Sequence, residues 1–175
     1  SILIRLTNSP VFLPVRKLVR NMFFPLPAPH SLKATVLIEI SSICNARCIF
    51  CNYRFGYRTR SLRSKEQFQK IATACVAKGY QILNLTSVGG ENTLNPELIE
   101  IISAAKEAGF KYVASYTNGI LLHRHDPVKL LTSGIDEIAI SFPSFEPELF
   151  KTIFGIDGFN DFARSIGQLL TEHSR

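Results

Sequence analysis

The sequence predicts an α/β fold in which parallel strands alternate with helices, and three observations support this prediction. From residue 34 onward, short apolar runs of strand length recur along the chain. Each run is followed by a segment whose apolar residues have helical spacing. Glycine or proline marks the junctions, as at Gly79, Pro96 and Gly109. Strands and helices that alternate in this way form parallel βα units with right-handed connections, so the sheet either stays open or curls toward a barrel.

The first predicted unit joins a strand over residues 34–40 to a helix over residues 64–78. Ser64 and Gln67 have the spacing of a capping box at the start of this helix, and Gly79 ends it. Its apolar stripe consists of Phe68, Ile71, Ala72, Cys75 and Val76.

Three further strands are predicted over residues 81–88, 111–117 and 135–141. Asn95 and Pro96 open a helix after the first of these strands, and Gly109 closes it. In an open sheet and in a barrel alike, ligands bind at the carboxyl ends of the strands.

Two helices complete the predicted pattern. A short one begins at Asp126 and ends at Gly134. The last one is capped by Asn160 or Asp161, and its apolar stripe is Phe162, Ile166, Leu169 and Leu170.

Residues 1–30 differ in character from residues 31–175, and we expect an amino-terminal segment followed by a βα core. Residues 11–24 oppose an apolar face to Arg16, Lys17 and Arg20, and residues 24–29 form a proline-rich linker. Such a face suits a membrane interface, or packing on the core or on a second subunit. Packing is the favoured interpretation, and membrane contact is not expected.

Composition indicates one soluble domain, which we expect to be cytoplasmic. Of the 175 residues, 46% are hydrophobic and 19% are charged, enough for an ordinary core. No apolar run reaches the roughly 18–20 residues that span a bilayer. The net charge of +6 arises partly from acid-free basic stretches at residues 1–38 and 54–65, which we interpret as solvated faces.

Cys44, Cys48 and Cys51 follow directly on the first strand of the predicted core, at its ligand end. Three thiolates on one short loop can hold a 4Fe–4S cluster and leave one iron open to another ligand. Structural zinc needs a fourth ligand, which would come from Cys75 or a histidine. Cys75 lies on an apolar helical stripe, where a buried cysteine is ordinary. The histidines on predicted loops are His30, His123 and His125.

Four motifs on successive βα units make the chain resemble the radical S-adenosylmethionine (radical SAM) enzymes. The first is the cysteine loop itself, with the aromatic Phe50 before its third cysteine. The others follow the later strands: Gly89-Gly90-Glu91, Thr117-Asn118-Gly119, and a strand that ends at Ser141. The resemblance covers about residues 36–170. It implies a partial TIM-like barrel, namely a truncated radical SAM core with the first four βα units.

The resemblance also implies a mechanism. A 4Fe–4S cluster on the three cysteines would cleave S-adenosylmethionine reductively, and the 5′-deoxyadenosyl radical would abstract hydrogen from an unidentified substrate. An electron donor such as flavodoxin or ferredoxin is implied. The expected cofactor-binding residues are Gly89, Gly90 and Glu91 for the amino group, Ser115, Thr117 and Ser141 for other polar contacts, and Phe50 near the adenine. The resemblance leaves the catalytic residues unknown.

The chain departs from the family pattern in two respects. Asn92 stands where proline commonly follows Gly-Gly-Glu, and four βα units replace the usual six. The alternative hypothesis is therefore a catalytically incomplete scaffold that holds an iron–sulfur cluster or zinc. Four parallel strands also predict an unpaired sheet edge at residues 135–141. We expect a missing carboxy-terminal half to cover this edge, ahead of a second subunit or a helix folded across it.

Overall fold

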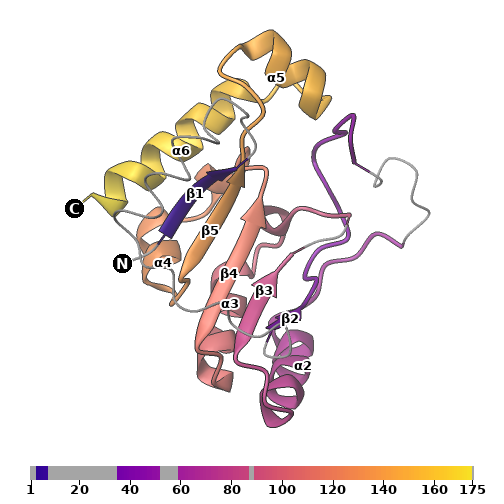
Figure 1. Cartoon of the computed structure of the whole chain (residues 1–175), viewed down its shortest axis with the longest axis vertical. Coiled ribbons are helices and arrows are strands. Elements are labelled where there is room, and N and C mark those ends of the chain that lie inside the picture. The colour runs from indigo at the N-terminus through magenta and orange to yellow at the C-terminus, as the bar shows by residue number, and fades with distance from the viewer. Residues whose placement is uncertain (1–2, 8–34, 52–58, 87–88, 175) are drawn as a thin grey trace, which may run out of the picture.

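The computed structural model describes residues 3–7, 35–51, 59–86 and 89–174. Five strands form one parallel sheet in the order β1-β5-β4-β3-β2 (Figure 1). The strands are β1 (Leu3–Thr7), β2 (Thr35–Leu37), β3 (Ile82–Leu85), β4 (Tyr112–Thr117) and β5 (Glu137–Ser141). The α-helices are α2 (Lys65–Ala77), α3 (Leu98–Ala108), α4 (Pro127–Thr132), α5 (Pro147–Phe154) and α6 (Phe159–His173). Two 3-10 turns, η4 (Asn92–Leu94) and η5 (Leu122–Arg124), follow β3 and β4.

The predicted fold class, a parallel βα repeat forming part of a TIM-like barrel, is confirmed. From β2 to β5 each strand pairs with the next one in the sequence. Right-handed connections that always step the same way place their helices on the same face of the sheet. The other face then lines the inside of the curved sheet, and all carboxyl ends open at one rim.

Apolar side chains from strands and helices meet in one core. Ile101 and Ile102 of α3 are fully buried with Leu83 and Leu85 of β3. Phe68 of α2 is also fully buried in this cluster. The capping box predicted for α2 is present, because Ser64 Oγ accepts from the Gln67 N–H while Gln67 Oε1 accepts from the Ser64 N–H. Helical period and capping therefore position the helices that support the rim.

The predicted unpaired edge at residues 135–141 is wrong. Strand β1 pairs in parallel with β5, with Ile4 opposite Ile138 and Thr7 opposite Ser141 (Figure 1). The expectation failed because it counted only the strands of the βα repeat, whereas a segment from residues 1–30 supplies a fifth strand. Edge backbone groups accept any strand that reaches them with the right direction.

The carboxy-terminal region departs from its prediction twice. Helix α5 was not predicted, although Pro147 at its first turn and the left-handed Gly155 at its end are ordinary boundary signals. Helix α6 begins at Phe159 after Gly158, not at the predicted Asn160 or Asp161 caps. Its start is set by packing, because the Phe159 ring lies 5.6 Å from the ring of Phe150.

Strand β2 is shorter than the predicted strand over residues 34–40. After Leu37 the chain pairs instead with a return segment, residues 59–63, through an antiparallel bridge between Ser41 and Leu62. The Arg63 N–H donates to the Ile40 carbonyl at 3.0 Å, and the Ser42 N–H donates to the Ser61 carbonyl at 3.0 Å. The chain on either side of the cysteine loop is thereby tied together.

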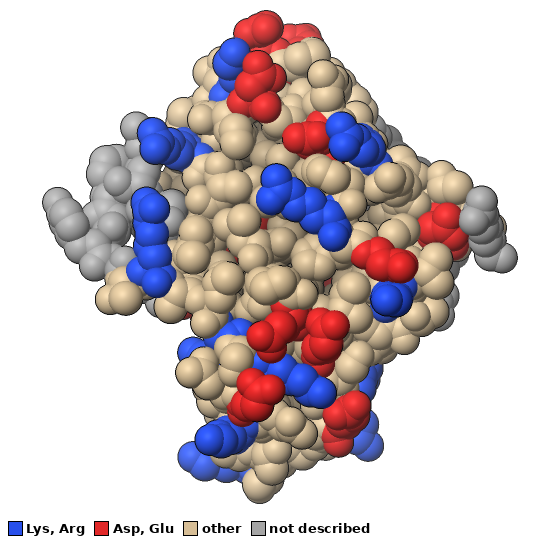
Figure 2. Space-filling model, turned by 180° about the vertical axis from the view of Figure 1, so that it is seen from behind, with Lys and Arg blue, Asp and Glu red and all other residues tan. Residues whose placement is uncertain are grey.

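The helix predicted over residues 11–24, the linker at 24–29 and His30 lie outside the described residues. Within the described part of the chain, none of the helices combines the length and apolar character that a membrane crossing requires. Figure 2 shows acidic and basic side chains interspersed over the face seen from behind. On this face, the net positive charge is not gathered into a single basic patch.

Candidate functional site

The cysteine loop begins after β2 and is held in place by helix α5. The Arg47 N–H donates to the Phe154 carbonyl at 2.9 Å, and the Ile49 N–H donates to the Ile153 carbonyl at 3.0 Å. These bonds use carbonyls in the last turn of α5, which have no partner inside the helix. A Cβ at Gly155 would lie 2.6 Å from the Arg47 carbonyl oxygen, so glycine is needed for this approach. The helix that the sequence missed is therefore the support of the loop.

The three cysteines of the loop are half-buried, and no disulfide is formed among the described residues. Burial raises the pKa of Cys44, against a weaker opposing effect of the Ala46 N–H, which donates to Cys44 Sγ at 3.4 Å. Burial, followed by the charges of Cys44 and Cys51, raises the pKa of Cys48 to about 11. Thiolates at these positions would repel one another, and a bound cation would relieve this repulsion.

The donor set fits an iron–sulfur cluster. In the described part of the chain, no three His, Cys, Asp or Glu side chains are grouped around a single point as ligands of one metal ion. Three cysteines of a four-iron cluster bind different irons, so they do not need to converge on one point as zinc ligands do. The loop also directs one N–H group to sulfur, that of Ala46, which donates to Cys44 Sγ at 3.4 Å.

The Gly-Gly-Glu segment lies directly against the chain that precedes Cys44. An added Cβ at Gly90 would lie 2.0 Å from the Ser41 carbonyl oxygen, so no other residue fits without a backbone shift. The Glu91 N–H donates to the Ile43 carbonyl at 2.7 Å. The predicted cofactor-binding segment and the predicted cluster loop are therefore neighbours at the same rim.

The carboxylate of Glu91 is only 3% exposed and accepts hydrogen bonds from four donors. Its Oε1 accepts from the Thr93 N–H at 3.0 Å, the Thr93 hydroxyl at 2.8 Å and the Thr117 hydroxyl at 2.6 Å. Its Oε2 accepts from the Asn118 N–H at 2.8 Å. Glu91 thus joins the loop after β3 to the loop after β4. An ammonium group approaching this carboxylate would share it with these four donors.

Asn92, the departure from the family pattern, is fully buried in η4. Its Nδ2 donates to the Leu85 carbonyl, to the Ser115 hydroxyl at 3.1 Å and to the Tyr116 carbonyl at 3.2 Å. Proline at this position would supply none of these donors. Asn92 therefore ties the carboxyl ends of β3 and β4 together and orients the hydroxyl of Ser115.

The other predicted site residues differ in how deeply they are buried. Ser115 and Thr117 are both buried at the end of β4, 5% exposed each. Ser141 is half-buried at the end of β5, beside Thr7 of β1. Phe50 is 67% exposed and projects from the cysteine loop. The rim therefore gathers Gly89, Gly90, Glu91, Ser115 and Thr117, while Phe50 faces outward.

Two asparagines of the site were not among the predicted site residues. The Asn118 Nδ2 donates to the Asn45 Oδ1 at 2.8 Å, a contact between the cysteine loop and the loop after β4. Asn118 lies in the Thr117-Asn118-Gly119 motif, and the left-handed conformation of Gly119 indicates a turn there. Nothing in the spacing of Asn45 indicated its partner, because the two residues are 73 positions apart.

His123 and His125, two of the histidines predicted to lie on loops, have structural partners. A ring nitrogen of His125 lies 2.9 Å from the Thr93 carbonyl oxygen. His123 Nδ1 lies 3.0 Å from the Ser165 hydroxyl and 3.1 Å from the Ile120 carbonyl oxygen. Cys75 packs against the core on α2, as predicted for a structural cysteine.

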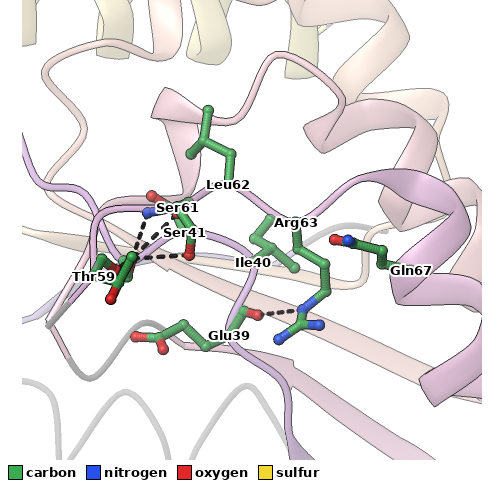
Figure 3. A pocket seen from close by; sticks show the side chains of 9 residues that line it. Glu39, Ile40, Ser41, Thr59, Ser61, Leu62, Arg63 and Gln67 are labelled. Carbon is green, nitrogen blue, oxygen red and sulfur yellow. Dashed lines mark hydrogen bonds between the residues drawn. The ribbon is translucent and has the colours of Figure 1, made fainter.

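A separate cavity of about 480 Å³ lies between the end of β2 and the return segment (Figure 3). Arg63 projects beside it, and its Nε donates to the Glu39 carbonyl at 3.0 Å. The residues that line the cavity are Glu39, Ile40, Ser41, Ser42, Thr59, Ser61, Leu62, Arg63 and Gln67. This lining includes none of the predicted site residues, although its Ser41 contacts Gly90.

Comparison with known proteins agrees with this arrangement. The family model described as the Radical SAM superfamily matches residues 38–171. A probable GTP 3′,8-cyclase of Saccharolobus islandicus is 35% identical over 123 residues, which are 70% of this chain and 39% of that protein. A probable GTP 3′,8-cyclase of Sulfolobus acidocaldarius is 38% identical over 120 residues, 69% of this chain and 37% of that protein. The chain thus spans about two fifths of the length of these curated relatives.

Solved structures share the fold at low sequence identity. The structure described as anSMEcpe with bound AdoMet has a TM-score of 0.61 and 21% identity, covering 79% of this chain and 41% of that one. BtrN in complex with AdoMet and 2-DOIA has a TM-score of 0.58 and 17% identity, covering 75% of this chain and 55% of that one. At such identities the likeness concerns the arrangement of strands and helices.

Proposed function

The chain belongs to the radical SAM superfamily of enzymes, and from this premise we propose that it holds a 4Fe–4S cluster on Cys44, Cys48 and Cys51 and binds S-adenosylmethionine beside it. The observation that carries the proposal is the contact between the Gly-Gly-Glu segment and the chain before Cys44, through the Glu91 N–H and the Ile43 carbonyl. This contact supports the proposal, because the segments expected to bind the cluster and the cofactor are neighbours. When bound, the cluster supplies the electron that cleaves S-adenosylmethionine to methionine and a 5′-deoxyadenosyl radical.

The protein's own groups would bind and orient the cofactor. We propose that the backbone at Gly89 and Gly90 receives the methionine amino group, because glycine allows a ligand to approach the main chain closely. Glu91 holds this backbone in place through its bonds to Thr93, Thr117 and Asn118. Its buried negative charge also favours a cationic group nearby.

Side chains at the ends of β4 and β5 complete the proposed site. Ser115, Thr117 and Ser141 provide hydroxyls for polar contacts, and Asn92 orients the first of them. Phe50 is exposed on the cysteine loop and is available to stack against the adenine. An electron donor such as flavodoxin or ferredoxin would deliver the electron, and the cytoplasm is the compartment we propose.

For the substrate we propose a guanine nucleotide. The support is the similarity to probable GTP 3′,8-cyclases, at 35% identity over 123 residues in the Saccharolobus islandicus relative. In such a reaction the radical would abstract hydrogen from the nucleotide. Since the chain spans 39% of that relative, the proposal concerns the part of the site that these residues form.

Anaerobic reconstitution tests the cluster. Protein reconstituted with iron and sulfide should contain about four irons per chain and have a broad absorbance that bleaches on reduction with dithionite. Alanine at Cys44, Cys48 or Cys51 should abolish the cluster, whereas Cys75→Ala should keep it. Stoichiometric zinc in place of iron under iron-replete conditions would reject the proposal.

Electron paramagnetic resonance tests the cofactor. S-adenosylmethionine should change the spectrum of the reduced cluster, because a ligand enters at the open iron. A cluster whose spectrum stays unchanged at saturating cofactor would instead support the scaffold alternative. For the substrate, GTP should raise the amount of 5′-deoxyadenosine formed with dithionite and S-adenosylmethionine, and ATP should not. Equal yields with GTP, ATP and no nucleotide would reject the guanine nucleotide.

A further inference from the structure

The side chain of Asn45 leaves a buried hydrogen-bond donor without a partner inside the cysteine loop. Asn45 follows Cys44 directly and precedes Cys48 by three residues. Its Nδ2 atom is buried and has no hydrogen-bond partner within the described part of the chain. Buried side-chain donors nearly always have an acceptor, so an unpaired one in a folded protein indicates an acceptor that is absent from the polypeptide.

The orientation of this amide is determined by its neighbours. The Ile120 N–H donates to the Asn118 Oδ1 at 3.0 Å, which identifies the oxygen of that carboxamide. The Asn118 Nδ2 then donates to the Asn45 Oδ1 at 2.8 Å. A flip of Asn45 would oppose two NH₂ groups, so its oxygen faces Asn118 and its NH₂ group remains the donor.

The bond from Asn118 is itself anchored. The Asn118 N–H donates to Glu91 Oε2 at 2.8 Å, and Glu91 is buried at 3% exposure. Glu91, Asn118 and Asn45 thus form a continuous chain of hydrogen bonds that ends in the unpaired NH₂ group. A donor oriented by two successive fixed groups is preorganised before any ligand arrives.

We propose that the Asn45 NH₂ group donates a hydrogen bond to a sulfur of the iron–sulfur cluster and thereby raises the reduction potential of that cluster. This inference rests on the proposed cluster. Sulfur already acts as an acceptor in the loop, since the Ala46 N–H donates to Cys44 Sγ at 3.4 Å. Hydrogen bonds to cluster sulfurs stabilise the added negative charge of the reduced state and raise the potential. Asn45 is thus a positioning and tuning residue, and it does not react itself.

An S-adenosylmethionine carboxylate is the competing acceptor, and the two can be separated experimentally. Asn45 lies between two proposed cluster ligands and its Nδ2 atom is buried, so the proposed bond to the cluster does not need the cofactor. A bond to the cofactor would affect the potential only when S-adenosylmethionine is present. The potential of the reconstituted cluster measured without S-adenosylmethionine is therefore the deciding quantity.

The test compares Asn45→Leu with the wild type in an anaerobic redox titration. Leucine has a similar volume and carries no donor and no charge. We expect reduction of the cluster to become roughly tenfold less favourable, which is 59 mV for a one-electron couple. Asn160→Leu, the same substitution at an exposed position on α6, is the matched control and should leave the potential unchanged. Equal potentials in Asn45→Leu and the wild type, or a shift seen only with S-adenosylmethionine, would overturn the inference.

A second measurement does not depend on the variant holding a cluster. Wild-type protein labelled with ¹⁵N in its asparagine side chains should have a ¹⁵N coupling in the pulsed magnetic resonance spectrum of the reduced cluster. The coupling should persist in Asn52→Leu, which removes the asparagine next to Cys51. Absence of the coupling would overturn the inference while leaving the cluster established. A wild-type chain that takes up no cluster would overturn both.

Discussion

The Oε2 atom of Glu91 lies 2.8 Å from the backbone nitrogen of Asn118 and accepts its hydrogen bond. This contact joins the loop after β3 to the loop after β4 at the carboxyl rim of the sheet. The Glu91 carboxylate acts as an acceptor in all of these hydrogen bonds. Two of its donors are backbone N–H groups, that of Thr93 at Oε1 and that of Asn118 at Oε2. The site therefore requires an acceptor at both oxygens of this side chain.

The first prediction is that Glu91→Gln destabilises the fold although it is nearly isosteric. Whichever way the amide is turned, its NH₂ group faces the N–H of Thr93 or that of Asn118, so one buried donor loses its acceptor. We expect a decrease of about 1–3 kcal/mol in the free energy of unfolding, measured by urea denaturation of the metal-free protein. Glu148→Gln, on the exposed side of α5, is the control and should be nearly neutral. Equal stability of Glu91→Gln and the wild type would contradict the hydrogen bonds described here.

The second prediction concerns Gly90, whose added Cβ would lie 2.0 Å from the Ser41 carbonyl oxygen. In Gly90→Ala, the backbone of the Gly-Gly-Glu segment or of Ser41 must shift, at a cost of about 1–3 kcal/mol. We expect weaker S-adenosylmethionine binding to the reconstituted cluster, measured by titration of the magnetic resonance change.

Gly167→Ala is the matched control for this change. An added Cβ at Gly167 meets no atom within 4 Å, and the residue lies inside helix α6. Alanine there should be stabilising by roughly 0.5–1 kcal/mol and should leave cofactor binding unchanged. If Gly90→Ala bound the cofactor as the control does, the close approach to Ser41 would have no functional consequence.

The third prediction tests whether helix α5 is the element that supports the cysteine loop. Gly155→Ala strains a left-handed residue with φ of 66° and also displaces the Arg47 carbonyl, 2.6 Å from the added Cβ. We expect the reconstituted cluster to lose iron faster to a chelator. Gly109→Ala also strains a residue with positive φ, here 110°, but the nearest neighbour of its added Cβ is a Val76 methyl group at 3.3 Å. Both variants should unfold more easily, by roughly 1–2 kcal/mol, and only Gly155→Ala should lose iron faster. Similar rates of iron loss in the two variants would contradict the role of α5 as the support of the cysteine loop.

The fourth prediction tests the pairing of β1 with β5. In a parallel pair, successive residues of an edge strand direct their N–H groups alternately toward the neighbour and away from it. Proline removes the N–H, so one of Ile4→Pro and Arg5→Pro should break a bond to β5 while the other spares the ladder. The expected difference in stability is about 0.5–1.5 kcal/mol. Hydrogen exchange of the β5 amides provides the readout, and identical exchange in both variants would argue against the strand.

Much of the repeat could be predicted from the sequence because it is encoded locally. The capping box at Ser64, the left-handed Gly109 and the apolar period of α2 and α3 each act within one or two turns of helix. The cysteine spacing likewise lies within a single loop. Local signals of this kind survive in any tertiary context that buries the same face.

Pairings between distant segments were decided only by the tertiary structure. Many apolar segments can form an edge strand, so the partner of β5 depends on which one reaches it. Two of the four donors to Glu91, those of Thr117 and Asn118, come from a loop 26 and 27 residues away. Asn45 meets Asn118 across 73 residues. Side-chain hydrogen bonds of this kind have no sequence period, because they depend on how the ends of neighbouring strands are brought together. The sequence by itself determined the cysteine loop and the βα repeat, whereas packing at the rim decided which side chains reach that loop.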